Sequence, residues 1–516
     1  MKSFILGLDG ATFYIINQLL EKGELPNFAK LIKNGSFGNL KSTNPPHTAP
    51  GWVSAITGVN PGKHGVYQFW DTQAPNYIGK FMGANDIEVK TVWELLNENG
   101  VTTAMVNVPM THPPRKLDGY MITWPLSKTL RYSYPVNLVP EIANAGGHYL
   151  PDICAMFEGN YDYIDKAIKI SNDRLTTVEY LLKEKPVDFM MVVFPEIDRI
   201  SHYYGHYMDR EDTQSEEFDK LKDAIFDIYK VADSIIGKIR GQLNEDCNFY
   251  VMSDHGFGRG NVNFYLNTYF VQKGLMNVKE DGEASKTENS VYHPVEGNWF
   301  KYYLDGKAYD VDWSHTKAYM SAPGSYGVNI NLKGRQEKGI VDIAQKYEVE
   351  EEIINELLKV VDPNTGKRLF KNVVRSSEVY KGRAVKYAPD LIIVPFDYGT
   401  MVHHQLTFDT LFGEPEQRGM HREEGIFILN GPHVKKQQIF NAKLEDVLPT
   451  LLYSLNMDIP DYIEGDVLDV FDKDFSSGSN IAQTQNKAEN SSKRGSSYSN
   501  QEKDSIQDKL KSLGYL

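Results

Sequence analysis

The feature that most constrains the fold is a short apolar run that ends abruptly in polar residues. Residues 248–252 (Asn-Phe-Tyr-Val-Met) are followed at once by Ser-Asp-His-Gly-Phe at 253–257. Such a run predicts a buried strand, and open α/β sheets hold their ligands at the carboxyl ends of strands. Asp254 and His255 would stand at that edge, and both residue types bind divalent metals. Asp-His-Gly also forms ordinary turns, so the motif alone leaves both interpretations open.

Similar apolar runs recur along the 516 residues and alternate with amphipathic segments. This alternation predicts an α/β fold with a largely parallel sheet covered on both faces. Apolar residues recur at helical spacing over 221–239 and over 175–182, and Pro186 blocks continuation of the second helix. The predicted strands are residues 4–8, 103–108, 188–194, 248–253, 390–395 and 425–429.

The regular alternation is interrupted in the second half of the chain. Residues 260–385 are less regular and rich in Tyr, Asn and Gly. We predict that they form an inserted cap, or lid, beside a catalytic core. That core would consist of residues 1–259 and 386–475.

The end of the chain changes composition once more. Residues 476–502 are rich in Ser, Asn, Gln and Lys, with almost no large apolar side chains. Because they cannot bury enough surface to become ordered, they are predicted to be a disordered linker. An apolar stripe at Ile506, Leu510 and Leu513 then predicts a C-terminal helix over 503–516.

Charge and composition exclude several classes of protein. Lys and Arg number 55 against 69 Asp and Glu, a net charge of −14, so no nucleic acid polymer is expected as a partner. Cys154 and Cys247 are too few for a disulfide framework or a thiolate-rich zinc site. Residues 1–9 read as a strand that turns acidic too soon for a signal peptide. No apolar run reaches the roughly 18 residues of a membrane span. We expect a soluble cytoplasmic protein, whose oligomeric state the sequence does not specify.

Two further segments place metal-binding residue types after predicted strands. Asp9 ends the first strand, where it could equally form a turn or cap the following helix. Asp198 and His202 are four residues apart, so a helical turn would put both on one face. A carboxylate and an imidazole at that spacing can bind one ion, although a plain surface pair has the same pattern. His206 continues the spacing as a competing ligand.

A proline-rich segment places a threonine at a predicted helix start. Residues 44–52 read Asn-Pro-Pro-His-Thr-Ala-Pro-Gly-Trp, and Pro50 suits the first turn of a helix. Thr48 would then lie at the helix N-terminus, where exposed N–H groups can hold an anion. Its alternative role is that of an N-cap only. Near the last predicted strand, His421 is either a structural residue or a further ligand.

The order of these motifs resembles the alkaline phosphatase superfamily. More closely, it resembles the type I phosphodiesterase/nucleotide pyrophosphatase branch and its prokaryotic phosphohydrolase and phosphomutase relatives. The resemblance runs from residue 5 to about residue 470, with further similarity at 25–28, 57–65 and in the tail at 509–515. It implies an alkaline-phosphatase-like three-layer sandwich, in which a mainly parallel sheet lies between helix layers and carries an inserted cap.

The resemblance also implies two divalent metal ions, zinc or alternatively manganese. One ion would be held by Asp198, His202 and His421. The other ion would be held by Asp9, Asp254 and His255. Thr48 would be the nucleophile, with its oxygen close to the second ion.

The implied activity is hydrolysis of a phosphodiester or pyrophosphate bond in a small phosphate ester such as a nucleotide. Metal coordination can activate a threonine hydroxyl, which is otherwise a poor nucleophile, and the reaction would pass through a phospho-threonine intermediate. Two departures from related enzymes bear on the substrate. Gln68 stands where nucleotide pyrophosphatases have an Asn, and no Arg beside Thr48 matches that of phosphomonoesterases and sulfatases.

Two kinds of alternative stay open. The first is a phosphomonoesterase, phosphomutase or phosphonate hydrolase that uses the same two-metal site. The second is a non-catalytic metal-binding scaffold, with which the acidic chain and the terminal helix are compatible.

Overall fold

The chain forms two compact units. Unit 1 comprises Met1–Val66, Gly83–Arg259 and Arg418–Ser497, and unit 2 comprises Tyr67–Met82, Gly260–Gln417 and Tyr498–Leu516. The computed structural model describes residues 1–125, 129, 131–147, 149, 162–209, 216–283, 300–304, 307–322, 324–407, 409–415, 418–473, 475 and 481–482. Cys154, the predicted C-terminal helix and nearly all of the predicted linker lie outside the described residues.

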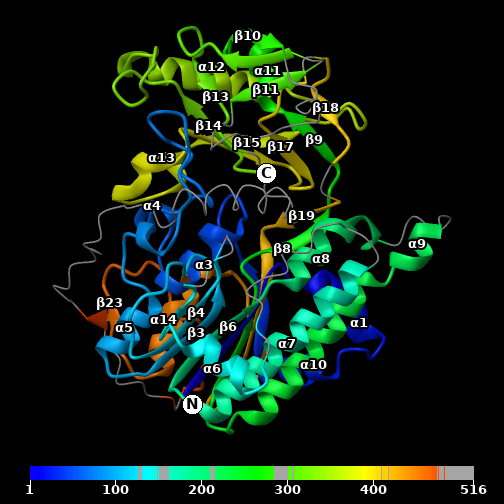
Figure 1. Ribbon diagram of the computed structural model, residues 1–516, viewed down its shortest axis with the longest axis vertical. Coiled ribbons are helices and arrows are strands. Elements are labelled where there is room, and N and C mark those ends of the chain that lie inside the picture. Colours follow the sequence, from blue (N-terminus) through cyan, green and yellow to red (C-terminus); the bar gives the residue numbers. More distant parts are fainter. Residues whose placement is uncertain are drawn as a thin grey trace. The chain divides into compact units, whose positions relative to one another are not determined.

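A ten-stranded sheet forms the centre of unit 1 (Figure 1). Its five central strands are parallel, in the order β4 (Gly119–Thr123), β3 (Thr103–Val108), β6 (Phe189–Phe194), β1 (Ser3–Leu8) and β7 (Asn248–Met252). Antiparallel strands extend both sides of this group: β5 (Ser133–Tyr134) pairs with β4, and β20 (Glu424–Asn430) pairs with β7. The remaining strands are β2 (Ser36–Lys41), β21 (Gln437–Gln438) and β22 (Ala442–Lys443).

Helices cover both faces of this sheet because its strands are apolar on both sides. Phe4, Leu6 and Leu8 of β1 pack in one apolar cluster, whereas Ile5 packs with Trp52 in the other. On the first face lie α1 (Phe13–Glu21), α7 (Asp162–Glu184) and α10 (Ala224–Gln242) (Figure 1). Helix α2 (Pro26–Asn34) packs in the same apolar cluster. On the second face lie α3 (Thr48–Thr57), α5 (Val92–Glu98) and α14 (Val447–Ser454). The predicted three-layer sandwich with a mainly parallel sheet is confirmed.

Helix α10 shows how the sequence pattern becomes a packed layer. Ile225, Ile228, Ile235 and Ile239 are buried on one side of it, and burying each isoleucine contributes about 1.5–3 kcal/mol. The predicted helix over 221–239 is interrupted, because Leu221 belongs to the separate short helix α9 (Glu216–Leu221). The other smaller elements of unit 1 are α4 (Pro61–His64), α6 (Leu138–Asn144), α8 (Glu196–Tyr204), β8 (Gly256–Arg259), β19 (Gly419–Arg422), β23 (Ile459–Pro460) and β24 (Ile481–Ala482).

Unit 2 contains antiparallel sheets of its own. The predicted strand 390–395 is β16 (Leu391–Pro395), which pairs antiparallel with β14 (Gly327–Ile330) and β15 (Phe370–Arg375) rather than joining the sheet of unit 1. The apolar run of β16 is similar to the runs that form the sheet of unit 1. Only the strands with which it pairs show that it belongs to a different sheet. The other elements are β9 (Val262–Tyr265), β10 (Val278–Glu283), β11 (Lys301–Leu304), β12 (Lys307–Val311), β13 (Ala318–Tyr319), β17 (Thr400–His403), β18 (Phe412–Gly413), α11 (Leu266–Gln272), α12 (Lys346–Leu357) and α13 (Ser376–Val379).

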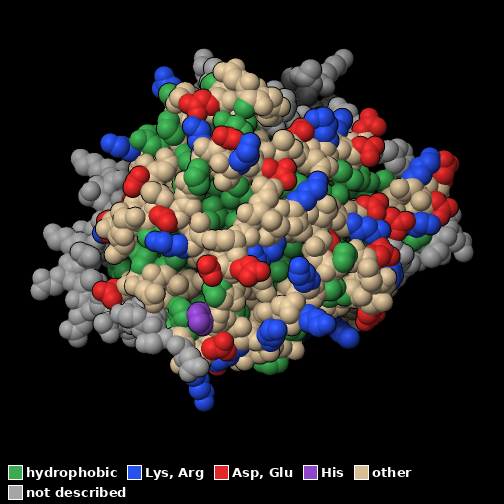
Figure 2. Space-filling model, turned by 90° about the horizontal axis from the view of Figure 1, so that it is seen from below, with side chains coloured by type: hydrophobic (Ala, Val, Ile, Leu, Met, Phe, Trp, Pro, Cys, Tyr) green, Lys and Arg blue, Asp and Glu red, His purple; other side chains and the backbone are tan. Residues whose placement is uncertain are grey.

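Charged side chains of both signs are dispersed over one face of the molecule (Figure 2). On the face shown in Figure 2, Lys and Arg side chains lie among Asp and Glu side chains, so the acidic excess is not gathered there into one patch. Among the described residues, no helix has the length and apolar character needed to cross a membrane.

Candidate metal centre

The site is built at the carboxyl ends of three adjacent parallel strands of unit 1. Asp9 directly follows β1, and Asp254 and His255 follow β7. Asp198 and His202 lie on α8, which begins two residues after β6. Because β1 pairs with both β6 and β7 in parallel, these strand ends meet at one edge of the sheet, as expected for an α/β ligand site.

Two other segments bring the remaining predicted residues to this edge. His421 lies on β19, opposite Phe257 of β8. Thr48 is the first residue of α3 and is fully buried. Its predicted alternative as an N-cap is wrong, because the cap is His47, whose Nδ1 accepts the N–H of Ala49 at 3.1 Å.

Close packing around the first strand end requires a glycine. Gly10 follows Asp9 and has a φ of +72°, a region that L side chains rarely adopt. A Cβ at this position would lie 3.2 Å from Cα of Asp198. The chain therefore turns away after β1 while α8 approaches its backbone.

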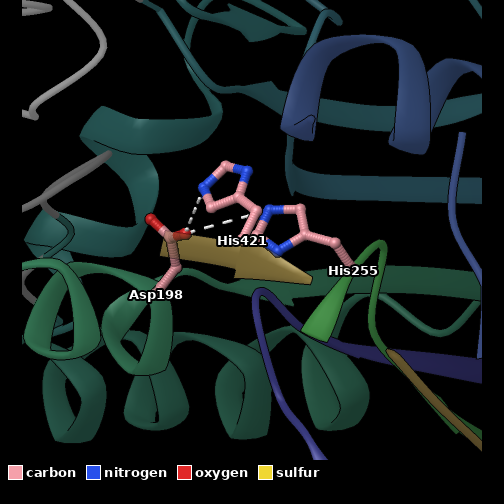
Figure 3. A group of neighbouring side chains, drawn as sticks. All are labelled: Asp198, His255 and His421. Atoms are coloured by element: carbon pink, nitrogen blue, oxygen red, sulfur yellow. Dashed lines mark ion pairs between the residues drawn. The ribbon is translucent and has the colours of Figure 1, made fainter. Parts of the chain in front are cut away.

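Asp198 faces three imidazoles. Its Oδ1 lies 3.3 Å from Nε2 of His421, 3.4 Å from Nε2 of His202 and 3.9 Å from Nε2 of His255. Asp198, His255 and His421 point toward one another from α8, from the turn after β7 and from β19 (Figure 3). Nε2 of His202 and Nε2 of His421 are only 3.2 Å apart.

A second group shares His255. Its Nε2 lies 3.2 Å from Oδ2 of Asp254, 3.5 Å from Oδ1 of Asp9 and 3.2 Å from Oγ1 of Thr48. Asp9, Asp254 and His255 have ligand atoms close enough to hold one ion, and so do Asp198, His255 and His421. The structure therefore brings all seven predicted site residues together, but the first group contains His255 where His202 was predicted, and Nε2 of His202 lies 3.4 Å from Oδ1 of Asp198. His206 belongs to neither group and lies in the 3₁₀ turn Gly205–Tyr207 after α8.

Backbone carbonyls fix the tautomer of all three imidazoles. Nδ1 of His202, His255 and His421 lies 3.0–3.2 Å from a carbonyl oxygen, that of Gly419, Gly256 and Pro46 respectively. A carbonyl oxygen can only accept, so each Nδ1 carries the proton and donates it. Each Nε2 is left with a lone pair directed at the carboxylates, the arrangement found in metal-bound histidines.

Burial acts strongly on the ionisable groups. Burial, followed by the nearby carboxylate of Asp198, raises the pKa of Asp9 to about 8. Burial, followed by Asp9, raises the pKa of Asp254 well above its usual value. Burial also disfavours the charged form of Asp198, but the guanidinium of Arg199 holds the pKa of that carboxyl well below its usual range. Burial lowers the pKa of His255, which keeps its imidazole neutral.

These observations test whether metal ions fit the site. Among the described residues, no group donates a hydrogen bond to Oδ1 of Asp9 or to Oδ2 of Asp254, although both atoms are buried. Buried carboxylate oxygens and facing nitrogen lone pairs repel one another unless a proton or a cation lies between them. Aspartate oxygens and imidazole nitrogens are ligands that suit zinc and manganese. The residues fit divalent cations.

Arg199 is a residue of the site that the sequence did not reveal. Its Nη1 donates to Oδ2 of Asp198 at 2.5 Å, and its side chain is almost completely buried. The one available signal was its position directly after Asp198, but an arginine in a surface-type helix is usually expected to reach solvent. Gln68, considered above as a replacement for an Asn, belongs to unit 2, where its Oε1 accepts the N–H of Phe69 at 3.2 Å.

Comparisons with known proteins identify a matching family and similar folds. The family model described as type I phosphodiesterase / nucleotide pyrophosphatase matches residues 4–422, whereas no curated protein matches the chain. Human ectonucleotide pyrophosphatase/phosphodiesterase 5 has a similar structure, with a TM-score of 0.52 and 14% identity, over 89% of this chain and 95% of that one.

Two further solved structures are similar. The murine protein of the same name, as an inactive threonine-to-alanine variant in complex with AMP, has a TM-score of 0.51 and 14% identity, over 89% of this chain and 95% of that one. Phosphonoacetate hydrolase from Sinorhizobium meliloti 1021, in complex with phosphonoacetate, has a TM-score of 0.53 and 12% identity, over 87% of this chain and 94% of that one. At these identities the likeness establishes the fold alone.

Proposed function

The chain belongs to the type I phosphodiesterase/nucleotide pyrophosphatase family, and from this premise we propose that it is a metal-dependent hydrolase of phosphodiester or pyrophosphate bonds. The observation that carries the proposal is the meeting of three carboxylates and three imidazoles at one edge of the sheet, with Nε2 of His255 at 3.2 Å from the buried hydroxyl of Thr48. Family membership confirms the predicted resemblance, and the site geometry supports the chemistry that this resemblance implies.

Six side chains would hold two divalent ions, zinc or alternatively manganese. Asp198, His202 and His421, whose facing atoms are 3.2–3.4 Å apart, would bind one ion. Asp9, Asp254 and His255 would bind the other. When bound, such ions lower the pKa of a coordinated hydroxyl and offset negative charge on a transferring phosphoryl group. The chain itself keeps the ligands oriented, since Trp52 Nε1 donates to Oδ2 of Asp9 at 3.1 Å and carbonyls fix the imidazoles.

Thr48 would act as the nucleophile. Its oxygen loses its proton to solvent and forms a bond to phosphorus, while the bond to the leaving alcohol or phosphate breaks and the leaving group takes up a proton from solvent, which gives a phospho-threonine. Water then attacks phosphorus and the bond to the Thr48 oxygen breaks, so that the phosphate product leaves and the Thr48 oxygen regains a proton. Thr48 lies at the N-terminus of α3, where the helix dipole places partial positive charge that favours the negative charge developing on the phosphoryl oxygens.

The proposed substrate is a small phosphate ester such as a nucleotide. The murine neighbour was captured with AMP, and its inactive variant has alanine in place of a threonine, which supports a nucleophilic role for Thr48. Phosphonate hydrolysis is the second candidate, because phosphonoacetate hydrolase shares the fold at a TM-score of 0.53.

A substrate panel with a matched pair of variants tests the proposal. We expect Thr48→Ala to lower kcat for bis(nitrophenyl) phosphate by roughly 10³-fold or more, because removal of a covalent nucleophile has effects of that size. Thr57→Ala is the control, since Thr57 is buried at the other end of α3, where its Oγ1 donates to the Val53 carbonyl at 2.6 Å. Chelation should abolish turnover, and added zinc or manganese should restore it.

The outcomes separate the alternatives. Diester turnover that survives Thr48→Ala would exclude the nucleophile. Much faster turnover of nitrophenyl phosphate than of the diester would assign a phosphomonoesterase, and preference for phosphonoacetate would assign a phosphonate hydrolase. Phosphorylated Thr48, detected by mass spectrometry after a single turnover, would be direct evidence for the intermediate.

A further inference from the structure

Arg199 occupies an unusual position for an arginine. It is 1% exposed and follows Asp198 on α8. Its guanidinium carbon lies 5.8 Å from the ring centroid of Trp124, which is 2% exposed, while its Nη1 donates to Asp198. A permanent cation is therefore held in the protein interior between an indole ring and a carboxylate.

The two oxygens of Asp198 have different partners. Oδ2 accepts the hydrogen bond from Arg199 at 2.5 Å. Oδ1 instead faces the imidazoles, at 3.3 Å from Nε2 of His421 and 3.4 Å from Nε2 of His202. With Oδ2 engaged and the guanidinium fixed by burial, the carboxylate cannot rotate to offer both oxygens to one ion.

We propose that Arg199 is the positioning residue of the first metal site: it presents Oδ1 of Asp198 alone to the ion. The inference rests on the proposed metal dependence and adds to it the residue that fixes a ligand. Groups that hydrogen-bond to a ligand in this way orient it and tune how tightly the metal is held. Arg199 also supplies a positive charge to a cluster of three aspartates. With metal ions bound, the site therefore attracts a negatively charged phosphate ester more strongly than it would without this arginine.

A second buried arginine provides a matched control. Arg174 of α7 forms an ion pair with Glu196, which lies on α8 two residues before Asp198. The side chains of this pair are as deeply buried as those of Arg199 and Asp198. Loss of the Arg174 side chain removes a comparable ion pair with a residue of α8, but it leaves the pair of Asp198 and Arg199 in place.

The test compares Arg199→Met, Arg199→Lys and Arg174→Met in the full chain. Metal affinity is measured with zinc alone, by competition with a chromogenic chelator, and folding is followed by near-ultraviolet circular dichroism. We expect Arg199→Met to lower the affinity for one of the two zinc ions by about 10–100-fold. Arg199→Lys should lie between this variant and the wild type, because an ammonium keeps the charge but loses the planar fork. Arg174→Met should lower the unfolding midpoint and keep wild-type zinc affinity.

Several results would overturn the inference. Wild-type zinc affinity in folded Arg199→Met excludes it, and so does equal zinc loss in Arg174→Met, which would show that any damage to α8 has this effect. If Arg199→Met does not fold, wild-type affinity in Arg199→Lys overturns it in the same way. A wild-type protein that binds no zinc or manganese would instead refute the proposed function, and the inference with it.

Discussion

Each unit contains a cluster of charged groups around buried carboxylates, and the two clusters differ in whether cationic side chains of the chain neutralise those carboxylates. In unit 2, Asp390 is 7% exposed and accepts bonds from Nη1 and Nη2 of Arg335 at 2.9 and 2.6 Å. Lys346 Nζ lies 2.9 Å from the same carboxylate, and Arg375 bonds to the neighbouring Glu350 at 2.8 Å. The chain itself neutralises this cluster.

In unit 1 the carboxylates outnumber the cations. Asp9 and Asp254 are as buried as Asp390, yet Arg199 is the cation that the structure places at their cluster. The pKa of Asp9 is accordingly raised to about 8, whereas Arg335 holds the pKa of Asp390 below its usual value despite its burial. Depth of burial does not distinguish a site from a structural network here. The balance of charge does, because an unbalanced cluster needs ions from solution.

The largest expected effect contrasts one aspartate from each cluster. In chelator-treated protein, we expect Asp390→Asn to lower the free energy of unfolding by about 3–5 kcal/mol, since Arg335 and Lys346 lose their buried partner. Asp254→Asn should cost less than about 1 kcal/mol under the same conditions, because a carboxyl with a raised pKa is already uncharged. Urea unfolding of both variants measures the difference.

Adding metal provides a second comparison of the stabilities of Asp390→Asn and Asp254→Asn. Added zinc should stabilise Asp390→Asn, whose metal site is intact, and should no longer stabilise Asp254→Asn to the same degree. Equal losses of stability in the two chelator-treated variants would contradict the comparison.

The second prediction concerns pH. Since the folded pKa of Asp9 is raised from 3.8 to about 8, its contribution to the stability of the metal-free protein is fully present below about pH 3.8. That contribution is lost as pH rises toward 8, by at most about 1.4 kcal/mol per pH unit. Unfolding midpoints measured across this range in the presence of chelator should fall, and Asp9→Asn should make the fall shallower, while Asp254, whose pKa is also raised, accounts for part of what remains. If the unfolding midpoint in the presence of chelator does not change with pH, the proposed excess of buried carboxylates over cations in unit 1 would be contradicted.

The smallest effect comes from a histidine with the opposite tautomer. Nδ1 of His64 accepts the N–H of Val66 at 3.1 Å, so Nε2 carries the proton and donates to Oγ of Ser54 at 3.1 Å. Burial lowers the pKa of His64 to about 3. Its contribution to stability is therefore present above the unfolded pKa of 6.5 and is lost as pH falls toward 3.

His64→Gln isolates this effect. The difference in unfolding free energy between the wild type and this variant should shrink as pH falls below about 6.5, by at most about 1.4 kcal/mol per pH unit. A difference that stays constant with pH would show that His64 does not remain neutral in the folded protein.

Part of this architecture could be predicted because it depends on local pattern. Apolar runs identified β1, β3, β6, β7 and β20, and Pro186 correctly bounded α7, which ends at Glu184. The run at 390–395 was a strand as well, but its pairing in unit 2 depends on distant partners that periodicity does not encode. For the same reason, local spacing grouped Asp198 with His202, and only the motif order linked them to His421.

The finer features of the site depend on three-dimensional contacts. For His421 and His202, the carbonyl that fixes the proton on Nδ1 lies far away in the chain, at Pro46 and Gly419 respectively. Arg199 could not be assigned to the interior without knowing that Trp124 lies against it. The sequence indicates which groups are available, and the packing decides their protonation and direction.

The hydrogen bond from His421 to the Pro46 carbonyl has a mechanical consequence. Pro46 lies two residues before Thr48, so the backbone that carries the attacking oxygen also sets the rotation of an imidazole from β19. A displacement of this short segment would therefore change the aim of the hydroxyl and the direction of the imidazole nitrogen together. The hydroxyl of Thr48 and the imidazole of His421 cannot be reoriented independently. A displaced segment would therefore misplace both groups.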